Sequence, residues 1–467
     1  MQLPVNCPTA SVIGAELRQI GRCEMNTRLR QENTEQEHLV RVIGFICILS
    51  SPLWIYGLYF PFHSNYLIEN NFPVLSLFLA LVLATQIILI RKMTAGDHFL
   101  AKVMIVGFLL KLAAVSAYMF MTLRVYEGVA DVFFYFSSGL RIAHGFSLTG
   151  DWDFPRPFWS TNFIIMLSSW LVAMFGPSFQ VLMIIFATLS YWGQYLFFRA
   201  FCIAFPQCRR ETAALFMFFL PSVVFWTATI GKDAVIFFFI GGCSYGFAKM
   251  AQRTTLVGLA TALISLGGVM LVRPHIAGML VISLGGAYLL SRNRRGLLGM
   301  AAKIVGIPLL LLASMYLVTQ ARTFLDLRDI DQTQGILRHV AEINQIGGSA
   351  IGGSLLYRLV AAPFLLFRPF LWEIRSPQAA IASIEAIGLM IYVWHRRDLV
   401  RSSLRSWREN AFVLFSCVYA MEFSLMFAGA MSNFGLLARQ RVMLTPLALM
   451  IVLSQPLPSV RCLRIRR

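Results

Sequence analysis

The strongest constraint on the fold is a succession of apolar blocks of roughly 20 residues, each long enough to cross a hydrocarbon core about 30 Å thick. In lipid, every backbone N–H and C=O group must find its hydrogen bond within the segment, so such blocks are expected to be helices. Hydrophobic residues make up 58% of the chain and charged residues only 13%, against about 25% charged residues in soluble domains. The sequence therefore predicts an all-α, polytopic integral membrane bundle and excludes a water-soluble enzyme.

The apolar blocks also set out the organisation of the chain. They lie at 40–60, 72–91, 102–123, 161–175, 178–198, 212–230, 234–250, 255–272, 275–291, 301–319, 355–372, 378–395, 410–430 and 441–454. We expect about 12–14 transmembrane or re-entrant helices in a domain over 39–455. A cytoplasmic tail at 1–38, in which Met25 is an alternative start, and a basic cytoplasmic tail at 456–467 flank this domain.

Lysine and arginine residues orient the predicted bundle. The 40 Lys and Arg residues outnumber the 22 Asp and Glu residues and leave a net charge of +18. Basic stretches lie at 18–41, 91–102, 199–210, 249–253, 292–303, 396–408 and 461–467. Because short basic loops stay on the cytoplasmic side, we expect these stretches and the N-terminus to face the cytoplasm from an inner (plasma) membrane. Such a surplus anchors loops and does not indicate nucleic-acid binding.

The remaining connections then face away from the cytoplasm. They are 61–71, 231–233, 273–275 and 431–441, with two long external loops at 124–160 and 320–354. Counting the crossings leaves open whether both 161–175 and 178–198 cross, and whether 355–372 crosses. A re-entrant or interfacial segment would resolve each case, because irregular backbone is tolerated where protein buries it.

The eight cysteines form no recognisable redox or metal motif. No two of them are spaced as CxxC, and no histidines accompany them at zinc-site spacing. Most lie in apolar blocks or in loops expected on the cytoplasmic side, where thiols stay reduced. We predict no structural disulfide and assign no cofactor, and a divalent metal ion is left open.

The first external loop holds a candidate for acid–base chemistry. Asp131 follows the third apolar block, and an amphipathic stretch suited to the membrane interface comes after it. A carboxylate at this position could act as a general base toward a hydroxyl group. Alternatively, Asp131 only caps the interfacial helix. Both interpretations stay open at this point.

Three turns on the same face carry candidate phosphate-binding residues. They are Lys232 and Asp233, then Arg273 and His275, and finally Arg439 and Arg441. Backbone N–H groups at a helix start favour a phosphate, and arginine can bind one through two parallel hydrogen bonds. Each turn also has a structural interpretation: helix capping by Asp233, snorkelling of Lys232 or Arg273, or anchoring by the last two arginines. Together with Asp131 they supply cations for a leaving phosphate and a base for an attacking hydroxyl.

Three further charges lie inside apolar blocks: Lys111, Glu385 and Glu422. Charges at membrane depth are costly and are expected to pair or to line a cavity. We predict a structural pairing for them.

The first external loop and the segments after it also carry a family resemblance. The loop contains Asp131 and Tyr135 in an Asp-x-x-x-Tyr spacing, followed by Gly139, Ala143 and Gly145. Then come Pro155-Arg156-Pro157, Asn162 and Phe175-Gly176-Pro177-Ser178. This order resembles the membrane-embedded GT-C-type glycosyltransferases, most clearly over about 120–240 of the chain.

The resemblance implies a GT-C-like fold and a hexosyl- or pentosyltransferase that takes its sugar from a polyprenyl-phosphate-linked donor. In that family the loop aspartate is the catalytic base, so Asp131 takes this role by resemblance. The implied acceptor is a glycan, lipid or protein on the extracytoplasmic face, in cell-envelope or exopolysaccharide synthesis. The chain departs from the family in lacking an adjacent second acid, for which Glu127, Asp151 and Asp153 are candidate substitutes, and in having two apolar blocks before the one that leads into the loop.

Two other functions stay open. A polysaccharide polymerase or ligase would transfer a whole lipid-linked oligosaccharide and would use external arginines without Asp131. A secondary transporter would need ion-coupling acids near the bilayer midplane, for which Glu385 and Glu422 are the candidates. The two halves of the chain do not match each other, so the sequence shows no sign of the inverted repeats that are typical of many transporters.

Overall fold

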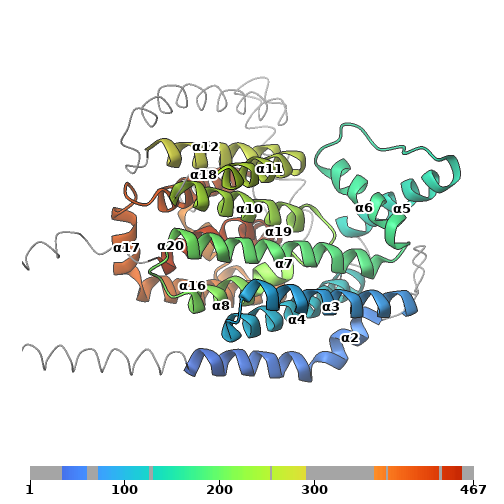
Figure 1. The fold of residues 1–467 in the computed structure, drawn as a ribbon, viewed down its shortest axis with the longest axis horizontal. Helices are drawn as coiled ribbons and strands as arrows, with labels where there is room; N and C mark the ends of the chain where they lie inside the picture. Colours follow the sequence, from blue (N-terminus) through green and yellow to red (C-terminus); the bar gives the residue numbers. More distant parts are fainter. Residues whose placement is uncertain are drawn as a thin grey trace, which may run out of the picture.

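The computed structural model describes residues 34–59, 72–125, 130–252, 255–290, 362–374, 377–430 and 434–454. All regular structure within these ranges is helical (Figure 1). The elements are α2 (Ser51–Tyr59), α3 (Phe72–Thr94), α4 (His98–Phe120), η1 (Met121–Val125), α5 (Asp131–Thr149), α6 (Thr161–Phe175), α7 (Phe179–Ala204), α8 (Arg210–Phe219), α9 (Pro221–Trp226), α10 (Lys232–Gln252), α11 (Leu256–Val272), α12 (Pro274–Leu290), η2 (Ala362–Phe367), η3 (Leu371–Glu373), α16 (Pro377–His395), α17 (Arg397–Arg405), α18 (Ala411–Ala430), α19 (Phe434–Gln440), η4 (Arg441–Met443) and α20 (Thr445–Leu453). A helix at Thr34–Leu49 precedes α2 at a bend of 51°.

Four helical segments are long and apolar enough to cross a membrane: α3, α4 continued by η1, α7 and α10. The number rises to six if two bent pairs, Thr34–Leu49 with Ser51–Leu58 and Gly435–Met443 with Thr445–Leu453, each count as one span. The predicted all-α class is thus confirmed for the described residues, and the apolar helices support a multi-pass membrane protein. The larger predicted number of helices includes the block 301–319, and this block and the loop 320–354 lie outside the described residues.

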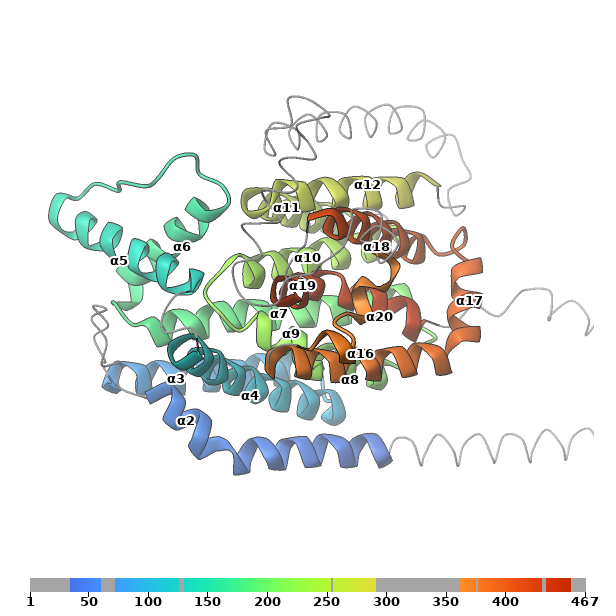
Figure 2. The ribbon, with the colours of Figure 1, turned by 180° about the vertical axis from the view of Figure 1, so that it is seen from behind.

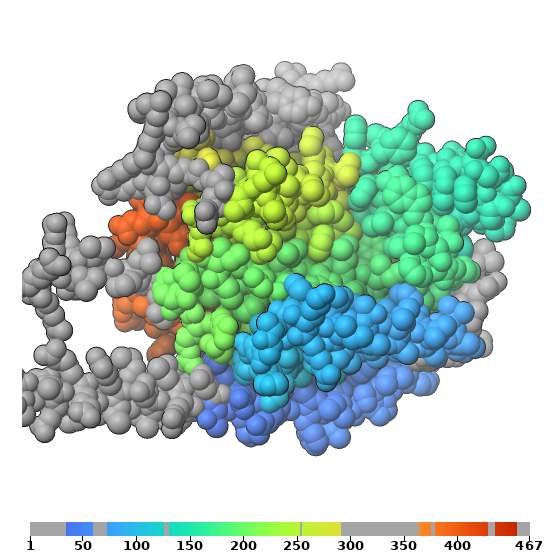
Figure 3. Space-filling model, in the orientation of Figure 1, coloured from blue at the N-terminus to red at the C-terminus, as the bar shows by residue number. Residues whose placement is uncertain are grey.

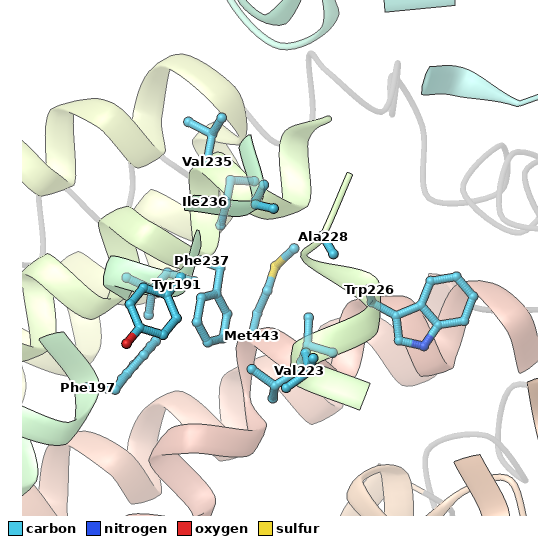
Figure 4. Packing of buried hydrophobic residues seen from close by; sticks show 14 of the residues in the cluster. Tyr191, Phe197, Val223, Trp226, Ala228, Val235, Ile236, Phe237 and Met443 are labelled. Atoms are coloured by element: carbon cyan, nitrogen blue, oxygen red, sulfur yellow. The ribbon is translucent and has the colours of Figure 1, made fainter. Parts of the chain in front are cut away.

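Helices α7 and α10 run side by side through the middle of the bundle. In Figure 1, α3 and α4 lie on one side of this pair, and α11, α12 and α18 lie on the other. Seen from behind, α19 and α20 lie in front of the pair, and α16 packs next to α19 (Figure 2). Buried side chains such as Tyr191 of α7, Phe237 of α10 and Met443 of η4 fill the space between these helices (Figure 4).

Glycines allow the closest contacts of α10. A Cβ atom added at Gly241 would lie 2.7 Å from the carbonyl oxygen of Gly193 on α7, and one added at Gly246 would lie 2.7 Å from the carbonyl oxygen of Gly258 on α11. Small residues at such positions let helix backbones approach closely in a membrane bundle. Because the opposing atoms belong to the backbone, a side chain here can be accommodated only if the helices separate.

We expect Gly241→Leu to lower the thermal unfolding midpoint of the purified protein in detergent, since overpacking of this kind costs about 1–3 kcal/mol. Gly267→Leu on α11 is the matched control, because a Cβ atom there meets no neighbouring atom within 4 Å. Its midpoint is expected to stay the same or rise slightly, as leucine is a better helix former than glycine. Equal midpoints for the two variants would contradict the close approach of α7 and α10.

The helix ends gather at two opposite ends of the bundle. At one end, Arg210 forms an ion pair with Asp97 (3.2 Å), and the Asn410 side chain donates a hydrogen bond to the carbonyl of Ala204 (3.2 Å). This end also carries α17 and the basic turns at the ends of α3, α7 and α10 (Figure 1). At the other end, α4, α9, α11 and α18 finish and α5, α10, α12 and α19 begin. The candidate site residues lie at this second end.

The two segments that the crossing count left open are both short in the structure. Helix α6 packs against α5, and the two form a hairpin (Figure 1) that lies at one end of the molecule in the space-filling view (Figure 3). Between 160 and 199 only α7 remains among the long apolar helices, which is the odd number that the flanking charges require. The described part of 355–372 consists of the short 3₁₀ helices η2 and η3 instead of a continuous helix.

Candidate functional site

The site is built around the turn between α9 and α10. Buried Lys111 of α4 caps the end of α9: its Nζ donates hydrogen bonds to the carbonyl of Val224 (3.1 Å) and to the hydroxyl of Thr227. The chain then turns at 227–231 and α10 starts at Lys232. These hydrogen bonds offset the cost of burying the ammonium group. Lys111 therefore has a structural role, and it positions the turn that carries the next two residues of the site.

Asp233 lies in the first turn of α10 and is fully buried. Its Oδ1 accepts a hydrogen bond from Nη2 of Arg273 (3.0 Å), and its Oδ2 accepts one from Nε of Arg439. The three residues come from α10, the α11–α12 turn and α19, so this carboxylate joins three segments. A buried charge is tolerated when it is paired and hydrogen bonded in this way.

Asp131 is the exposed carboxylate of the site. It is the first residue of α5, its side chain is 65% exposed, and its Oδ2 accepts a hydrogen bond from Nη1 of Arg439 (3.3 Å). The helix cap itself is Ala130. Arg439 therefore bridges an exposed carboxylate and a buried one.

Lys232 is fastened to the end of the long loop between α5 and α6. Its Nζ donates a hydrogen bond to the hydroxyl of Ser160 (3.0 Å), and the backbone N–H of Ser160 donates to the carbonyl of Leu271 (2.7 Å). Ser160 has a φ of 58°, a conformation uncommon for a residue with a side chain. Sequence reasoning missed Ser160, because a serine at the end of a loop carries no distinguishing pattern.

Tyr135 lies one helical turn after Asp131 on α5 and is almost completely buried, with 4% of its surface exposed. A Cβ atom added at Gly231 would lie 3.8 Å from the Tyr135 ring and 3.7 Å from Nη2 of Arg439, so the phenol belongs to the same cluster. Burial, and after it the charge of Asp131, raises the pKa of Tyr135 to about 12. The hydroxyl stays protonated at neutral pH and can donate a hydrogen bond, but it cannot serve as a base there.

Two further residues hold the guanidinium of Arg273. Its Nη1 donates a hydrogen bond to Oε1 of Gln440 and lies 3.7 Å from the sulfur of Met443. Sequence reasoning missed both residues. In the Arg439-Gln440-Arg441 run, only the arginines were predicted to be site residues, because the glutamine between them carries no charge.

The structure brings together five residues that the sequence singled out. They are Asp131, Lys232, Asp233, Arg273 and Arg439, and we call them the charge cluster: ion pairs join four of them, and Lys232 interacts with these four through its charge. Three cations against two carboxylates leave the charge cluster with a formal charge of +1. Such a site favours a phosphate group and offers one exposed carboxylate beside it.

Arg441 does not belong to this cluster, contrary to the expected phosphate-binding role. It is fully buried, its Nη2 forms an ion pair with Glu385 (3.0 Å), and its Nη1 donates a hydrogen bond to the carbonyl of Arg368 (2.8 Å). Glu385 also accepts hydrogen bonds from the N–H and the hydroxyl of Ser222 (2.6 Å each). The cause is local geometry: α19 ends at Gln440, and the change to η4 directs the next arginine into the bundle. This burial and pairing favour a structural role for Arg441.

His275 is the other predicted phosphate-binding residue that is not part of the charge cluster. It lies in the first turn of α12, two residues after Arg273, and its ring packs edge-on against Phe427 of α18 with centroids 6.4 Å apart. This contact ties α12 to α18 beside the charge cluster. We assign His275 a packing role there.

The candidate secondary acids are not part of the charge cluster. Asp151 and Asp153 are exposed, and within the described part of the chain neither forms an ion pair. They flank Trp152, whose ring stacks on Phe146 (4.1 Å) and on Phe154 (5.0 Å). Glu127 lies outside the described residues.

Metal and thiol chemistry would need particular arrangements of His, Cys, Asp and Glu side chains. No group of three or more His, Cys, Asp or Glu side chains that could hold a metal ion occurs in the described ranges. The five cysteines in these ranges, Cys47, Cys202, Cys208, Cys243 and Cys417, are free thiols. Glu422, a partly buried acid of α18, accepts a hydrogen bond from the hydroxyl of Ser283 (2.8 Å).

Comparison with models of known protein families, with curated protein sequences and with solved structures gives no match for this chain.

Proposed function

We propose that this protein is an integral membrane glycosyltransferase of GT-C type, which transfers a sugar from a polyprenyl-phosphate-linked donor to an acceptor hydroxyl on the extracytoplasmic face during cell-envelope or exopolysaccharide synthesis. One observation carries the proposal: the continuous chain of contacts from Asp131 through Arg439 and Asp233 to Arg273 at one end of an apolar bundle. It unites an exposed acid with cations that a buried acid holds in position.

The two carboxylates have different roles in the proposal. Asp233 is fully buried and both of its oxygens accept hydrogen bonds from arginines, so it orients Arg273 and Arg439. Asp131 is largely exposed, and its one ion pair in the described structure is with Arg439. It is therefore the carboxylate that can reach the proton of an incoming hydroxyl.

The reaction assigns a role to each group of the charge cluster. The acceptor oxygen attacks the anomeric carbon of the sugar, and Asp131 takes the proton of the acceptor hydroxyl. The bond from the anomeric carbon to the phosphate oxygen breaks, and its electron pair leaves with the lipid phosphate. Lys232, Arg273 and Arg439 stabilise the negative charge on this phosphate, because cations fixed in advance pay no reorganisation cost during the reaction.

The position of the charge cluster supports a lipid-linked donor over a soluble one. The long apolar helix α4 ends near the charge cluster, and the long apolar helix α10 begins in it. Polar and ionisable groups placed where apolar helices end lie at the level of lipid headgroups. A donor with a phosphate at this level keeps its prenyl chain in the hydrocarbon region.

The phosphate half of the proposal is tested with Lys232→Met. Binding of sugar-free polyprenyl phosphate to the purified protein in nanodiscs is expected to weaken by about tenfold or more, since a hydrogen bond to a charged group contributes about 1.5–3 kcal/mol. Lys232 is a suitable position because its hydrogen bond in the site is to the neutral Ser160, so the variant leaves no buried acid unpaired.

Arg141→Met is the matched control for this experiment. Arg141 is an exposed cation of α5 at the same end of the bundle, and it is not a member of the charge cluster. The control variant is expected to bind as the wild type does. The proposed phosphate site is wrong if Lys232→Met binds as tightly as the wild type, or if both variants lose affinity equally.

A further inference from the structure

A cavity of about 460 Å³ lies between α2 and the last turns of α4 with η1. This volume is within the range of about 300–1,000 Å³ typical of ligand sites. Its apolar wall includes Leu53 and Trp54 from α2 and Ala117 and Phe120 from α4. The proposed sugar transfer assigns no role to this cavity.

The walls of the cavity are held by contacts between the two helices. The hydroxyl of Ser116 donates a hydrogen bond to the carbonyl of Trp54 (2.6 Å). A Cβ atom added at Gly57 would lie 3.0 Å from Cβ of Ser116, so α2 and α4 already approach each other closely there. The cavity is therefore a preformed feature of the α2–α4 contact.

Helix α4 separates the cavity from the charge cluster. Ala113, Ala117 and Phe120 follow one another at helical spacing on the cavity side. Tyr118 belongs to the opposite side, where its ring lies 6.4 Å from the ring of Trp226, just before the turn of the candidate site. The cavity is thus on the outer side of α4 and the charge cluster on the inner side.

The chemistry of the lining indicates an amphipathic ligand. Arg124 is the one charged residue in the lining, and it lies at the end of the apolar segment His98–Val125. Leu53, Tyr56 and Phe120 also expose 76%, 62% and 64% of their surfaces, so the rim is apolar and open to the outside of the bundle. An apolar chain fits the cavity, and a negative headgroup fits the cation at its end.

We propose that this cavity binds an acyl chain of a bilayer phospholipid with an anionic headgroup, and that the lipid phosphate lies against Arg124. The position on the outer side of α4 favours a bilayer phospholipid over the sugar donor, because a donor must place its phosphate at the charge cluster on the inner side. The proposal rests on the cavity and on the charge of Arg124, and it does not depend on the proposed sugar transfer.

Native mass spectrometry of the full-length protein tests the proposal, with phosphatidylglycerol and phosphatidylcholine of identical chains added to the delipidated protein. We expect phosphatidylglycerol to be retained preferentially. Arg124→Gln should weaken its binding by about fivefold, the effect of one cation near an anionic lipid surface. Ala117→Phe should weaken retention of both lipids, because the ring occupies part of the cavity. Arg141→Gln, which changes an exposed cation outside the cavity, should bind as the wild type does.

Three results would overturn the proposal. If the wild type and Arg124→Gln retain phosphatidylglycerol equally well, and neither prefers it over phosphatidylcholine, then Arg124 does not bind the anionic headgroup. Undiminished retention of both lipids by a folded Ala117→Phe variant would remove the cavity as the binding site. Displacement of phosphatidylglycerol by polyprenyl phosphate in the wild type, but not in Lys232→Met, would show that the retained lipid occupies the donor site. If Ala117→Phe does not fold, the surface variant Arg124→Gln still decides the question.

Discussion

Replacing Asp131 with asparagine is expected to reduce sugar transfer by about 10²–10⁴-fold, the usual contribution of a general base. The amide can still accept the hydrogen bond that Arg439 donates to the carboxylate, so binding of polyprenyl phosphate and the thermal unfolding midpoint should change little. The measurement is transfer of labelled sugar from a panel of polyprenyl-phosphate-linked hexoses and pentoses to acceptors in native membranes. A wild-type protein that uses no donor of this panel would refute the donor class.

Asp153→Asn is the matched control, because it removes an exposed acid of the same loop that is not in the charge cluster. It should keep its transfer activity. If Asp131→Asn also keeps full activity, Asp131 is not the base, and a polymerase or ligase that relies on arginines alone becomes the better interpretation.

Arg441→Met is expected to destabilise the fold by about 3–5 kcal/mol, because it leaves the buried carboxylate of Glu385 without its cation. Both side chains of this pair are almost fully buried, with 1% and 5% exposed. The loss should appear as a large fall in the thermal unfolding midpoint in detergent, while the remaining folded protein binds polyprenyl phosphate with unchanged affinity.

The double variant Glu385→Gln/Arg441→Met separates a structural role from a binding role. Removing both charges takes away the unpaired ion, and the glutamine oxygen can still accept from Ser222, so much of the lost stability should return. A role of Arg441 in phosphate binding would be indicated instead if Arg441→Met kept the wild-type midpoint and lost affinity.

Much of the candidate site could be predicted from the sequence because its residues interrupt apolar segments. Lys232, Arg273 and Arg439 are conspicuous since charges are costly next to lipid and are kept there for pairing or function. Arg441 is equally conspicuous in sequence, two residues from Arg439, but the structure places it in a buried ion pair with Glu385 and outside the charge cluster. The direction of each of these two arginine side chains, toward the site or into the core, depends on the residue at which α19 ends and η4 begins. The composition of the segment does not indicate that residue.

The neutral members of the site could not be predicted. Ser160 and Gln440 acquire their roles only through contacts with residues 72 and 167 positions away, respectively, in the chain. A hydroxyl or an amide is common in any loop or helix end, so its presence alone does not indicate a partner. Tyr135 entered the sequence analysis only through its spacing from Asp131, and its burial, which keeps the phenol neutral, depends on the packing of α5.

The amino-acid sequence by itself determined that this protein is built of apolar helices, several of them long enough to cross a membrane, because a helix satisfies the backbone groups of a long uncharged segment. It also determined that the polar chemistry lies at the ends of those segments. Only the tertiary structure decided that Asp233 is the buried partner of two arginines and that Asp131 is the exposed acid. The physical reason is that ion pairing depends on distances of a few ångströms between side chains that are far apart in the chain, and these distances exist only once the helices have packed.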